Sequence, residues 1–234
     1  MRWHSQFGQD YWIATKIFPG VRDGTFIDVG ASHRVDGTMS NTLALERDLG
    51  WRGLLIEGNR TLAAELWAQR RSPVVEAVIG DCDGRPVPWL ELEPERVDTP
   101  GHGGILRDDD ERLRRFRKSQ ASVELRTTLS LQTVLSRHSV PEYVHFLSID
   151  VEGAECEVLD GLDFSLHRFG AVVVESLPDT EPRVTRVLEG AGYVGLGRVH
   201  GDLYFLPRDG VPQDRDPSPQ VAAAEYAQLP APPL

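Results

Sequence analysis

Acidic residues stand at the ends of several apolar segments of the sequence, and they are the side chains best suited to chemistry. Asp28, Glu57, Asp150 and Glu175 each lie at or next to the end of such a segment. A carboxylate in that position can accept hydrogen bonds from a ligand, take up a proton or bind a divalent ion. We therefore treat these acids as candidates for ligand binding and for proton transfer.

The densest group of acids follows the apolar residues 144–149. Asp150, Glu152 and Glu155 come there in close succession. Carboxylates close together repel one another, so each one costs free energy unless it meets a cation, a metal or a hydrogen-bond donor. Proton removal and divalent-metal binding both fit this cluster, and Glu155 alone also suits the first turn of the helix that follows. We take as catalytic candidates Asp150, Glu152, Glu175 and His200.

A second group of residues indicates a bound small molecule. Asp28 and Gly30 close a segment typical of a buried parallel strand that runs into a tight turn, where glycine lets the backbone approach a ligand. Glu57 ends the next such segment and is followed by Gly58; its carboxylate can accept both hydrogen bonds of a ribose diol. Gln9 either caps the first helix or reaches the same ligand. These features predict a nucleotide-like ligand at the carboxyl ends of the strands.

The elements that position these residues alternate between strands and helices. Apolar runs predict strands at 25–29, 52–57, 74–79, 144–149 and 171–175, and an antiparallel pair at 193–199 and 203–206. Helical periodicity and capping residues predict helices at 11–18, 43–49, 60–70, 128–138 and 182–190. This alternation is typical of an α/β fold with a mostly parallel sheet.

The middle and the end of the chain are less regular. Short strands are predicted at 88–91 and 123–129. The insertion between them, at about 92–122, forms either a lid over the crevice or a solvated, charged surface helix. We expect one domain over residues 1–206, followed by a Pro- and Ala-rich flexible tail at 207–234.

Composition excludes several classes of protein. The 234 residues carry a net charge of −11, which argues against a nucleic-acid partner because such a partner needs a basic face. No apolar run approaches the ~18 residues of a membrane helix, and the N-terminus has no signal-peptide core. Cys82 and Cys156 fit no metal spacing and predict free thiols. We expect a cytoplasmic protein with no membrane partner, of open oligomeric state.

Five motifs together resemble one enzyme family. They are Ser-Gln-Phe-Gly-Gln-Asp at 5–10, Phe-Ile-Asp-Val-Gly-Ala-Ser at 26–32, Ser-Asn-Thr at 40–42, Leu-Leu-Ile-Glu at 54–57 and Ser-Ile-Asp-Val-Glu-Gly-Ala-Glu at 148–155. This set is similar to the FkbM family of S-adenosylmethionine-dependent methyltransferases, with the last motif the most specific. The resemblance runs from Ser5 to Leu206. It implies a class I, Rossmann-like fold: a seven-stranded sheet with one antiparallel strand and helices on both faces.

The resemblance also implies roles for individual residues. It implies O-methylation of a hydroxyl on a small molecule such as a sugar or polyketide, in secondary metabolism. Asp150, Glu152 and the hairpin 200–202 fall where acceptor and methyl group meet. The implied cofactor-binding residues are Gln9, Asp28, Gly30, Ser32, Asn41, Thr42, Glu57, Gly58, Ile79, Gly80 and Asp150.

Two other functions compete with this interpretation. A dinucleotide-dependent oxidoreductase shares the acid after the second strand, but it needs a G-x-G-x-x-G loop, and residues 28–33 contain a single glycine, Gly30. A binding module that keeps the nucleotide pocket without catalysis is the other. The acids Asp150 and Glu152 favour an enzyme, and the sequence does not identify the acceptor or decide on a metal.

Overall fold

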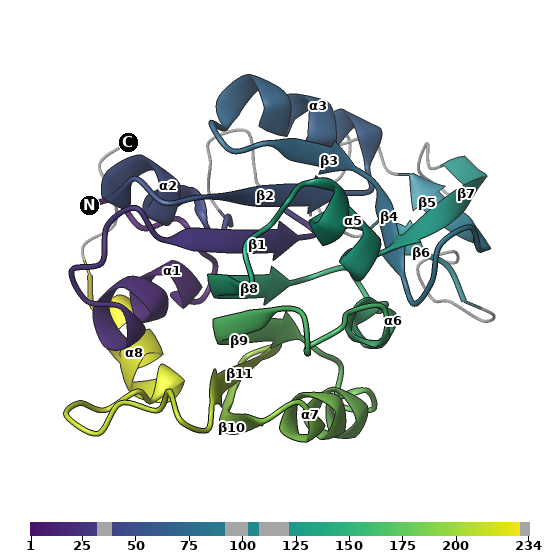
Figure 1. Cartoon of the computed structure of the whole chain (residues 1–234). Coiled ribbons are helices and arrows are strands. Elements are labelled where there is room, and N and C mark those ends of the chain that lie inside the picture. Colours follow the sequence, from purple (N-terminus) through teal and green to yellow (C-terminus); the bar gives the residue numbers. More distant parts are fainter. Residues whose placement is uncertain (32–38, 92–102, 108–121, 230–234) are drawn as a thin grey trace.

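The chain forms a mixed α/β structure around one large sheet (Figure 1). The computed structural model describes residues 1–31, 39–91, 103–107 and 122–229. The strands of the large sheet are β1 Thr25–Val29, β2 Arg52–Glu57, β3 Val74–Glu76, β8 Tyr143–Ile149, β9 Arg168–Glu175, β10 Tyr193–Val199 and β11 Asp202–Pro207.

The order of strands in this sheet is β10-β11-β9-β8-β1-β2-β3. Neighbouring strands from β9 through β8, β1 and β2 to β3 pair in parallel, whereas β11 is antiparallel to both β9 and β10. The predicted seven-stranded, mostly parallel sheet with one antiparallel strand is thus confirmed. The strand order reverses at the centre of the sheet, between β1 and β8: later strands are added outward from β1 on one side and from β8 on the other. A crevice for ligands is expected at the carboxyl ends of the two strands at such a point.

Helices pack on both faces of the sheet because successive side chains in each strand alternate between the faces. Ile27 of β1 packs in a core with α5 Leu131–Arg137, α6 Glu155–Asp160 and α7 Glu181–Gly190. Phe26 packs in a second core on the opposite face of the sheet, and we call that side of the sheet the N-terminal face. The helices of that core are α1 Gln9–Trp12, the π-helix η1 Ile13–Ile17, α2 Leu43–Leu49, α3 Arg60–Gln69 and α8 Pro219–Tyr226.

Local sequence explains where the helices begin and end. The Asn59 side chain accepts a hydrogen bond from Leu62 N (3.0 Å) and caps α3, as predicted. Gly50 ends α2 with φ of 74°, a conformation that favours glycine. The predicted helix at 11–18 differs, because α1 is one short turn that continues into η1. The π-helical turn brings Trp12, Ile13 and Ile17 into the core.

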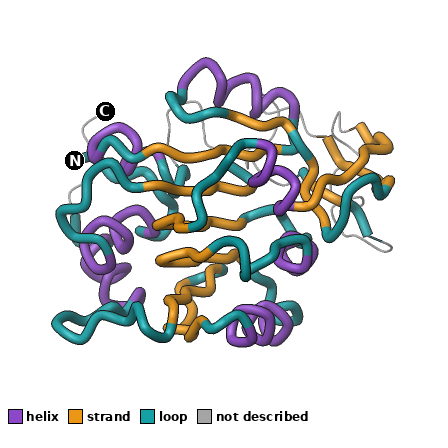
Figure 2. The backbone as a smooth tube through the Cα atoms, viewed as in Figure 1, coloured by secondary structure: helices purple, strands orange, loops and turns teal. Residues whose placement is uncertain are grey.

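A second, four-stranded sheet stands beside the first, and the sequence did not predict it (Figure 2). Its order is β4-β7-β5-β6, and we call it the small sheet. Its strands are β4 Val78–Gly80, β5 Pro86–Glu91, β6 Gly104–Ile105 and β7 Ser122–Ser130. In Figure 1, strands β1, β2 and β8 point toward it.

The small sheet corrects one predicted strand. The apolar run 74–79 is divided at Ala77, whose N–H donates to Glu57 O (3.0 Å). The residues before Ala77 pair with β2, whereas Val78 turns away to pair in parallel with Thr128 of β7. An apolar run is equally compatible with either partner, so periodicity alone could not locate the break.

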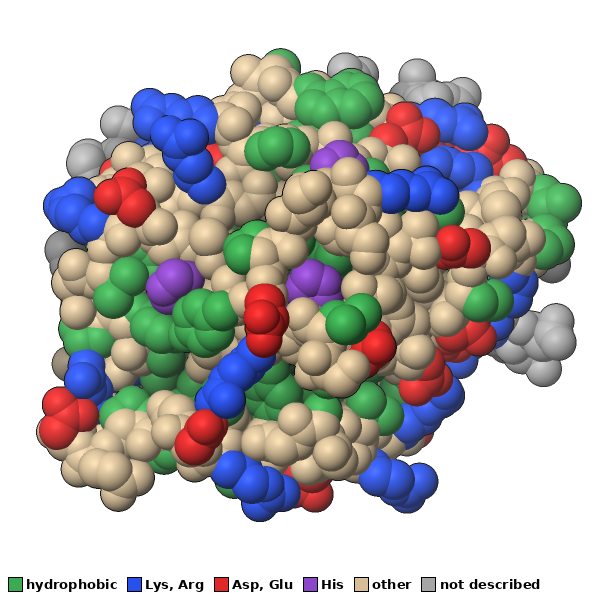
Figure 3. Space-filling view, in the orientation of Figure 1, with side chains coloured by type: hydrophobic (Ala, Val, Ile, Leu, Met, Phe, Trp, Pro, Cys, Tyr) green, Lys and Arg blue, Asp and Glu red, His purple; other side chains and the backbone are tan. Residues whose placement is uncertain are grey.

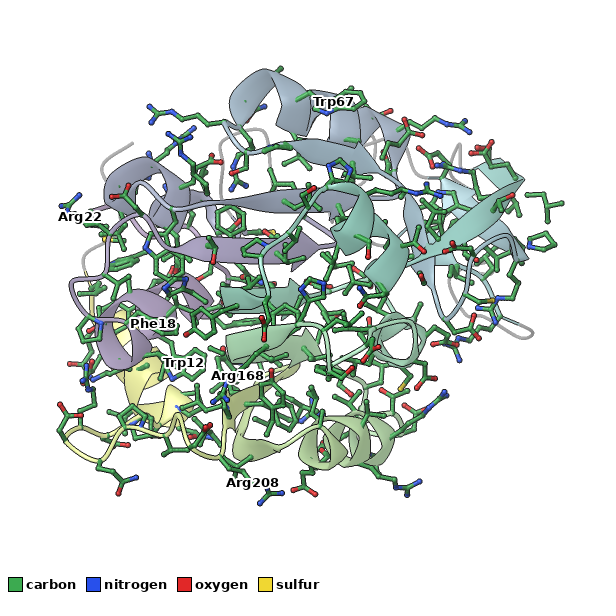
Figure 4. The ribbon with its side chains drawn as sticks, viewed as in Figure 1. Trp12, Phe18, Arg22, Trp67, Arg168 and Arg208 are labelled. Atoms are coloured by element: carbon green, nitrogen blue, oxygen red, sulfur yellow. The ribbon has the colours of Figure 1, made fainter. Side chains whose placement is uncertain are left out.

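The C-terminal segment corrects the predicted flexible tail. Within residues 207–229, Ser218 caps α8 through Val221 N (3.2 Å), and Ala222 is buried against the N-terminal face. Trp12 Nε1 donates to Pro217 O (2.8 Å), and Figure 4 shows Trp12 between the first helix and this segment. Helical periodicity did not indicate this helix, because its apolar residues are mostly small alanines that form no one-sided stripe.

Other predictions met the structure in different ways. Both cysteines are free thiols, Cys82 exposed and Cys156 buried, as predicted. The insertion at 92–122 lies outside the described residues except for 103–107 and Ser122. Across the described ranges we find no helix with the length and apolar character to cross a membrane. On the face shown in Figure 3, acidic and basic side chains are interspersed rather than gathered by sign.

Candidate functional site

Asp28 at the end of β1 is buried on the N-terminal face and held by a polar network. Thr42 Oγ1 donates to its Oδ2 (2.6 Å), and Arg70 Nη2 donates to Thr42 Oγ1 (3.0 Å). Arg70 Nε also donates to Glu46 Oε2 (2.8 Å), and neither side chain of this pair is exposed by more than 3%. Burial raises the pKa of Asp28, whereas the Thr42 hydroxyl and the Arg70 charge lower it. The network holds the Asp28 side chain in place, but the positive charge of Arg70 is paired directly with Glu46 and not with Asp28.

The fold itself requires glycine at position 30, and the approach of a ligand to this turn stays a prediction. The φ of Gly30 is 80°, and a Cβ there would come within 1.6 Å of Asp150 O. Gly30 N donates to Ile56 O (2.8 Å), and Asp150 N donates to Val29 O (2.9 Å). The glycine therefore lets the ends of β1, β2 and β8 approach one another, which brings Asp28 and Asp150 to one edge.

Glu57 ends β2 on the same face as Asp28. Its Oε1 accepts a hydrogen bond from Asn59 N (2.7 Å), and the side chain is buried. Burial raises its pKa to about 7, and the charges of Glu91 and Asp28 add to the rise. A ligand with hydrogen-bond donors or positive charge would favour the ionised form of this carboxyl.

Three carboxylates meet at the ends of β8 and β9. Ligand atoms of Asp150, Glu152 and Glu175 all lie within 4.8 Å of one another, a spacing that could hold a metal ion. The pKa of Asp150 lies well above its ordinary value because it is buried and close to Glu175, with which it shares a hydrogen bond. Glu152 has φ of 58°, so the turn places it in a strained conformation. The coupling to Glu175 therefore makes Asp150 hold a proton more tightly than an isolated carboxyl does.

Glu155 belongs to the fold. Its Oε1 accepts from Gly153 N (2.8 Å) and Val151 N (3.3 Å), which stabilises the turn that carries Glu152. Burial raises its pKa to about 7. The structural alternative for this residue, as an acid at the start of α6, is the one that the geometry supports.

Asp202, in the hairpin 200–202 that the resemblance places at the mouth of the site, lies with the acidic group. It begins β11 directly opposite Glu175 and is buried, and Gln9 Nε2 donates to its Oδ2. Burial and Glu175 raise its pKa to about 7. His200 is exposed, and its ring stacks on Phe7 with centroids 4.2 Å apart. Gln9 thus contacts the acid cluster, and His200 lies at its rim with an aromatic partner.

Of the remaining candidates, one lies near the acids and two belong to the packing of the fold. Asn41 Nδ2 donates to Ser148 Oγ (3.0 Å), which places Asn41 between the two acid groups on β1 and β8. Ile79 is buried in the core on the face opposite Asp28, and Gly80 packs against Thr128 and Gly161 of the fold. Ser32 lies outside the described residues.

These residues form two acidic groups along one edge of a mostly parallel sheet. Asp28 and Glu57 make the first, which we call the ribose-side acids, and Asp150, Glu152, Glu175 and Asp202 make the second, the acid cluster. In α/β sheets, the carboxyl ends of the central strands are the usual position of a small-molecule site.

Comparison with known families gives the class of enzyme. The model of the Methyltransferase FkbM domain matches residues 28–194, well over half of the chain. The chain belongs to the FkbM methyltransferase family. A search of curated proteins found no match. The matched range includes Asp28, Glu57 and Glu175, and it excludes Gln9, His200 and Asp202.

Proposed function

We propose that the protein is an S-adenosylmethionine-dependent O-methyltransferase of the class I fold that acts on a hydroxyl of a small molecule. One observation carries the proposal: two groups of acids, one suited to a ribose and one to proton transfer, share one edge of the sheet in a methyltransferase family member. The position of the antiparallel strand β11, next to the sheet edge, supports the class I assignment.

The ribose-side acids fit the proposed cofactor by the chemistry of their atoms. Glu57 offers a buried carboxylate, an acceptor that matches the two donors of a ribose diol. Asp28 sits beside it with a raised pKa, so a cationic group of the ligand would stabilise both carboxylates in their charged forms. S-adenosylmethionine, when bound, supplies an electrophilic methyl group together with such cationic groups.

The acid cluster supports the chemical step that an alcohol requires. An acceptor hydroxyl is a weak nucleophile until its proton is taken up, and Asp150 with its raised pKa is the best-placed acceptor of that proton. Glu175 shares a hydrogen bond with Asp150 and would stabilise the protonated form. Glu152 completes a set that could instead hold a divalent ion, which lowers the pKa of a bound hydroxyl.

The same cluster restricts the acceptor. Four carboxyl groups in one place repel anionic molecules, so a neutral or cationic hydroxylated acceptor is favoured over one that carries phosphate or carboxylate. The half-buried Phe7 ring and the exposed His200 ring stacked on it offer a ring surface at the rim.

Calorimetry tests the cofactor. We expect S-adenosylhomocysteine to bind, and Glu57→Ala to weaken it by about 1–3 kcal/mol because hydrogen bonds to a charged acceptor are lost. NAD serves as the control ligand for the oxidoreductase alternative. Binding of NAD without binding of S-adenosylhomocysteine would overturn the proposal.

Turnover with hydroxylated acceptors separates catalysis from mere cofactor binding. Asp150→Asn keeps the side chain's shape, so we expect turnover to fall by ~10²-fold while cofactor affinity stays nearly unchanged. If a metal acts in the cluster, chelation abolishes turnover and a divalent ion restores it. If Asp150 acts alone as the base, chelation has no effect. Near-normal turnover of Asp150→Asn would remove Asp150 from the mechanism.

A further inference from the structure

We infer that the small sheet positions the cofactor-binding turn, with Trp89 and Arg126 as positioning residues for Glu57. The inference rests on the proposed function, because it concerns the turn that would hold the ribose. Neither residue was a candidate from sequence, and both contact the turn that follows Glu57.

Trp89 of β5 fills the space beside Gly58, the residue that follows Glu57. A Cβ at Gly58 would lie 2.3 Å from Trp89 Cη2 and 2.7 Å from Cζ2. Gly58 does not have the positive φ that would itself require glycine. The indole ring is therefore the reason for a glycine here, and the backbone of the turn lies directly against that ring.

The indole ring is itself held in place. Trp89 is buried and packs with Val78 and Val87 of the small sheet. Its Nε1 donates to Glu91 Oε2 (2.5 Å), and the Arg126 guanidinium lies 5.9 Å from the ring centroid. A ring with both its edge and its face engaged cannot move aside easily.

Polar side chains from β5 and β7 of the small sheet bind both ends of the turn. Arg126 Nη1 donates to Gly58 O (3.2 Å), while its Nη2 donates to Glu76 Oε1 (3.1 Å) at the end of β3. Glu91 Oε1 accepts from Arg60 N (2.9 Å), the first residue of α3. The turn from Glu57 to α3 is thus attached to the small sheet at Gly58 and at Arg60.

These contacts should affect cofactor binding near Glu57 and not the acid cluster. Glu57 can present its carboxylate to a ribose only while the turn after it keeps its place, so loss of the ring or of Arg126 should weaken cofactor binding. The acid cluster lies at the ends of β8 and β9, so the acceptor's KM should respond little.

A double-mutant cycle on Gly58 and Trp89 tests the contact. We expect Gly58→Ala to weaken S-adenosylhomocysteine binding about tenfold in calorimetry and to raise the KM for S-adenosylmethionine more than it lowers kcat. In a Trp89→Leu background, where the ring is gone, the same Gly58→Ala change should alter binding by less than about threefold. Equal losses in both backgrounds would overturn the inference.

Arg126→Gln keeps the Trp89 ring but removes the guanidinium from Gly58 O and from the face of that ring. We expect about five- to tenfold weaker binding of S-adenosylhomocysteine, with the acceptor KM unchanged. The matched control is Arg85→Gln, in the turn just before β5 and paired with Asp81, and it should bind like the wild type. An Arg126→Gln variant that is folded and binds normally would overturn the inference, whereas a wild type that binds no S-adenosylhomocysteine would overturn the proposed function and this inference with it.

Discussion

Replacing Glu57 by glutamine should make the ligand-free protein more stable at pH 8. The same change removes the carboxylate that we propose accepts hydrogen bonds from the cofactor's ribose. Glu57 is buried, and its pKa is raised from 4.5 to about 7. At pH 8 the wild type must therefore keep an ionised carboxylate in a site that disfavours the charge. Glutamine has the same shape, stays neutral, and its carbonyl can still accept the hydrogen bond from Asn59 N.

The magnitude follows from proton linkage. A group with a raised folded-state pKa binds more protons when folded, so its contribution to stability is lost as pH rises from its unfolded pKa, 4.5, through about 7. Between pH 5.5 and pH 8 the wild type should lose about 2 kcal/mol at this one carboxyl, a loss that Glu57→Gln does not share. The stability difference between variant and wild type should widen by that amount over the same interval.

Urea unfolding of the ligand-free proteins at the two pH values measures this difference. The slopes of the unfolding curves should match, so that a change in midpoint reports stability. The same variant should bind S-adenosylhomocysteine more weakly at pH 8. Glu57 would then lower the stability of the ligand-free protein while it strengthens cofactor binding. A variant whose stability follows pH in parallel with the wild type would refute the assignment of the raised pKa to Glu57.

Three further outcomes follow from other contacts. Arg70→Met should lower the free energy of unfolding by about 3–5 kcal/mol in chemical denaturation, because it leaves Glu46 buried without its cation; a loss below 1 kcal/mol would contradict that. Ala222→Asp should lower Tm by about 4–8 °C through a buried charge, while Ala224→Asp on the exposed side of α8 should not. Arg107→Gln removes the hydrogen bond to Gly153 O (2.6 Å) and should reduce kcat about three- to tenfold without changing the cofactor KM; an equal change in both would show a general loss of structure.

The sequence predicted the parts of the site that depend on local patterns. The strand-end acids Asp28, Glu57 and Glu175 lie where the apolar runs placed them, and Asn59 caps α3 as its position before the helix indicated. A parallel sheet brings the ends of its central strands together, so Asp150 and Glu175 were expected to be close.

The remaining features depend on partners that are distant in sequence. Gln9 and Asp202 are 193 positions apart, and only the fold brings them together. The crowding at Gly30 comes from Asp150 at the end of a neighbouring strand, a reason for glycine that the local sequence could not show. For α8 a local signal was present: Ser218 followed by a proline is a good helix start, and it was outweighed by the composition of the segment around it.

The contact between α8 and the N-terminal segment has a consequence for how the protein is made. Tyr226 OH donates to Ser5 O (2.8 Å), and its ring lies against Gly8, one residue before Gln9. A ribosome makes Ser5 first and Tyr226 more than two hundred residues later. The contacts that α8 makes with the segment carrying Gln9 can therefore form only after nearly all of the described chain has been made.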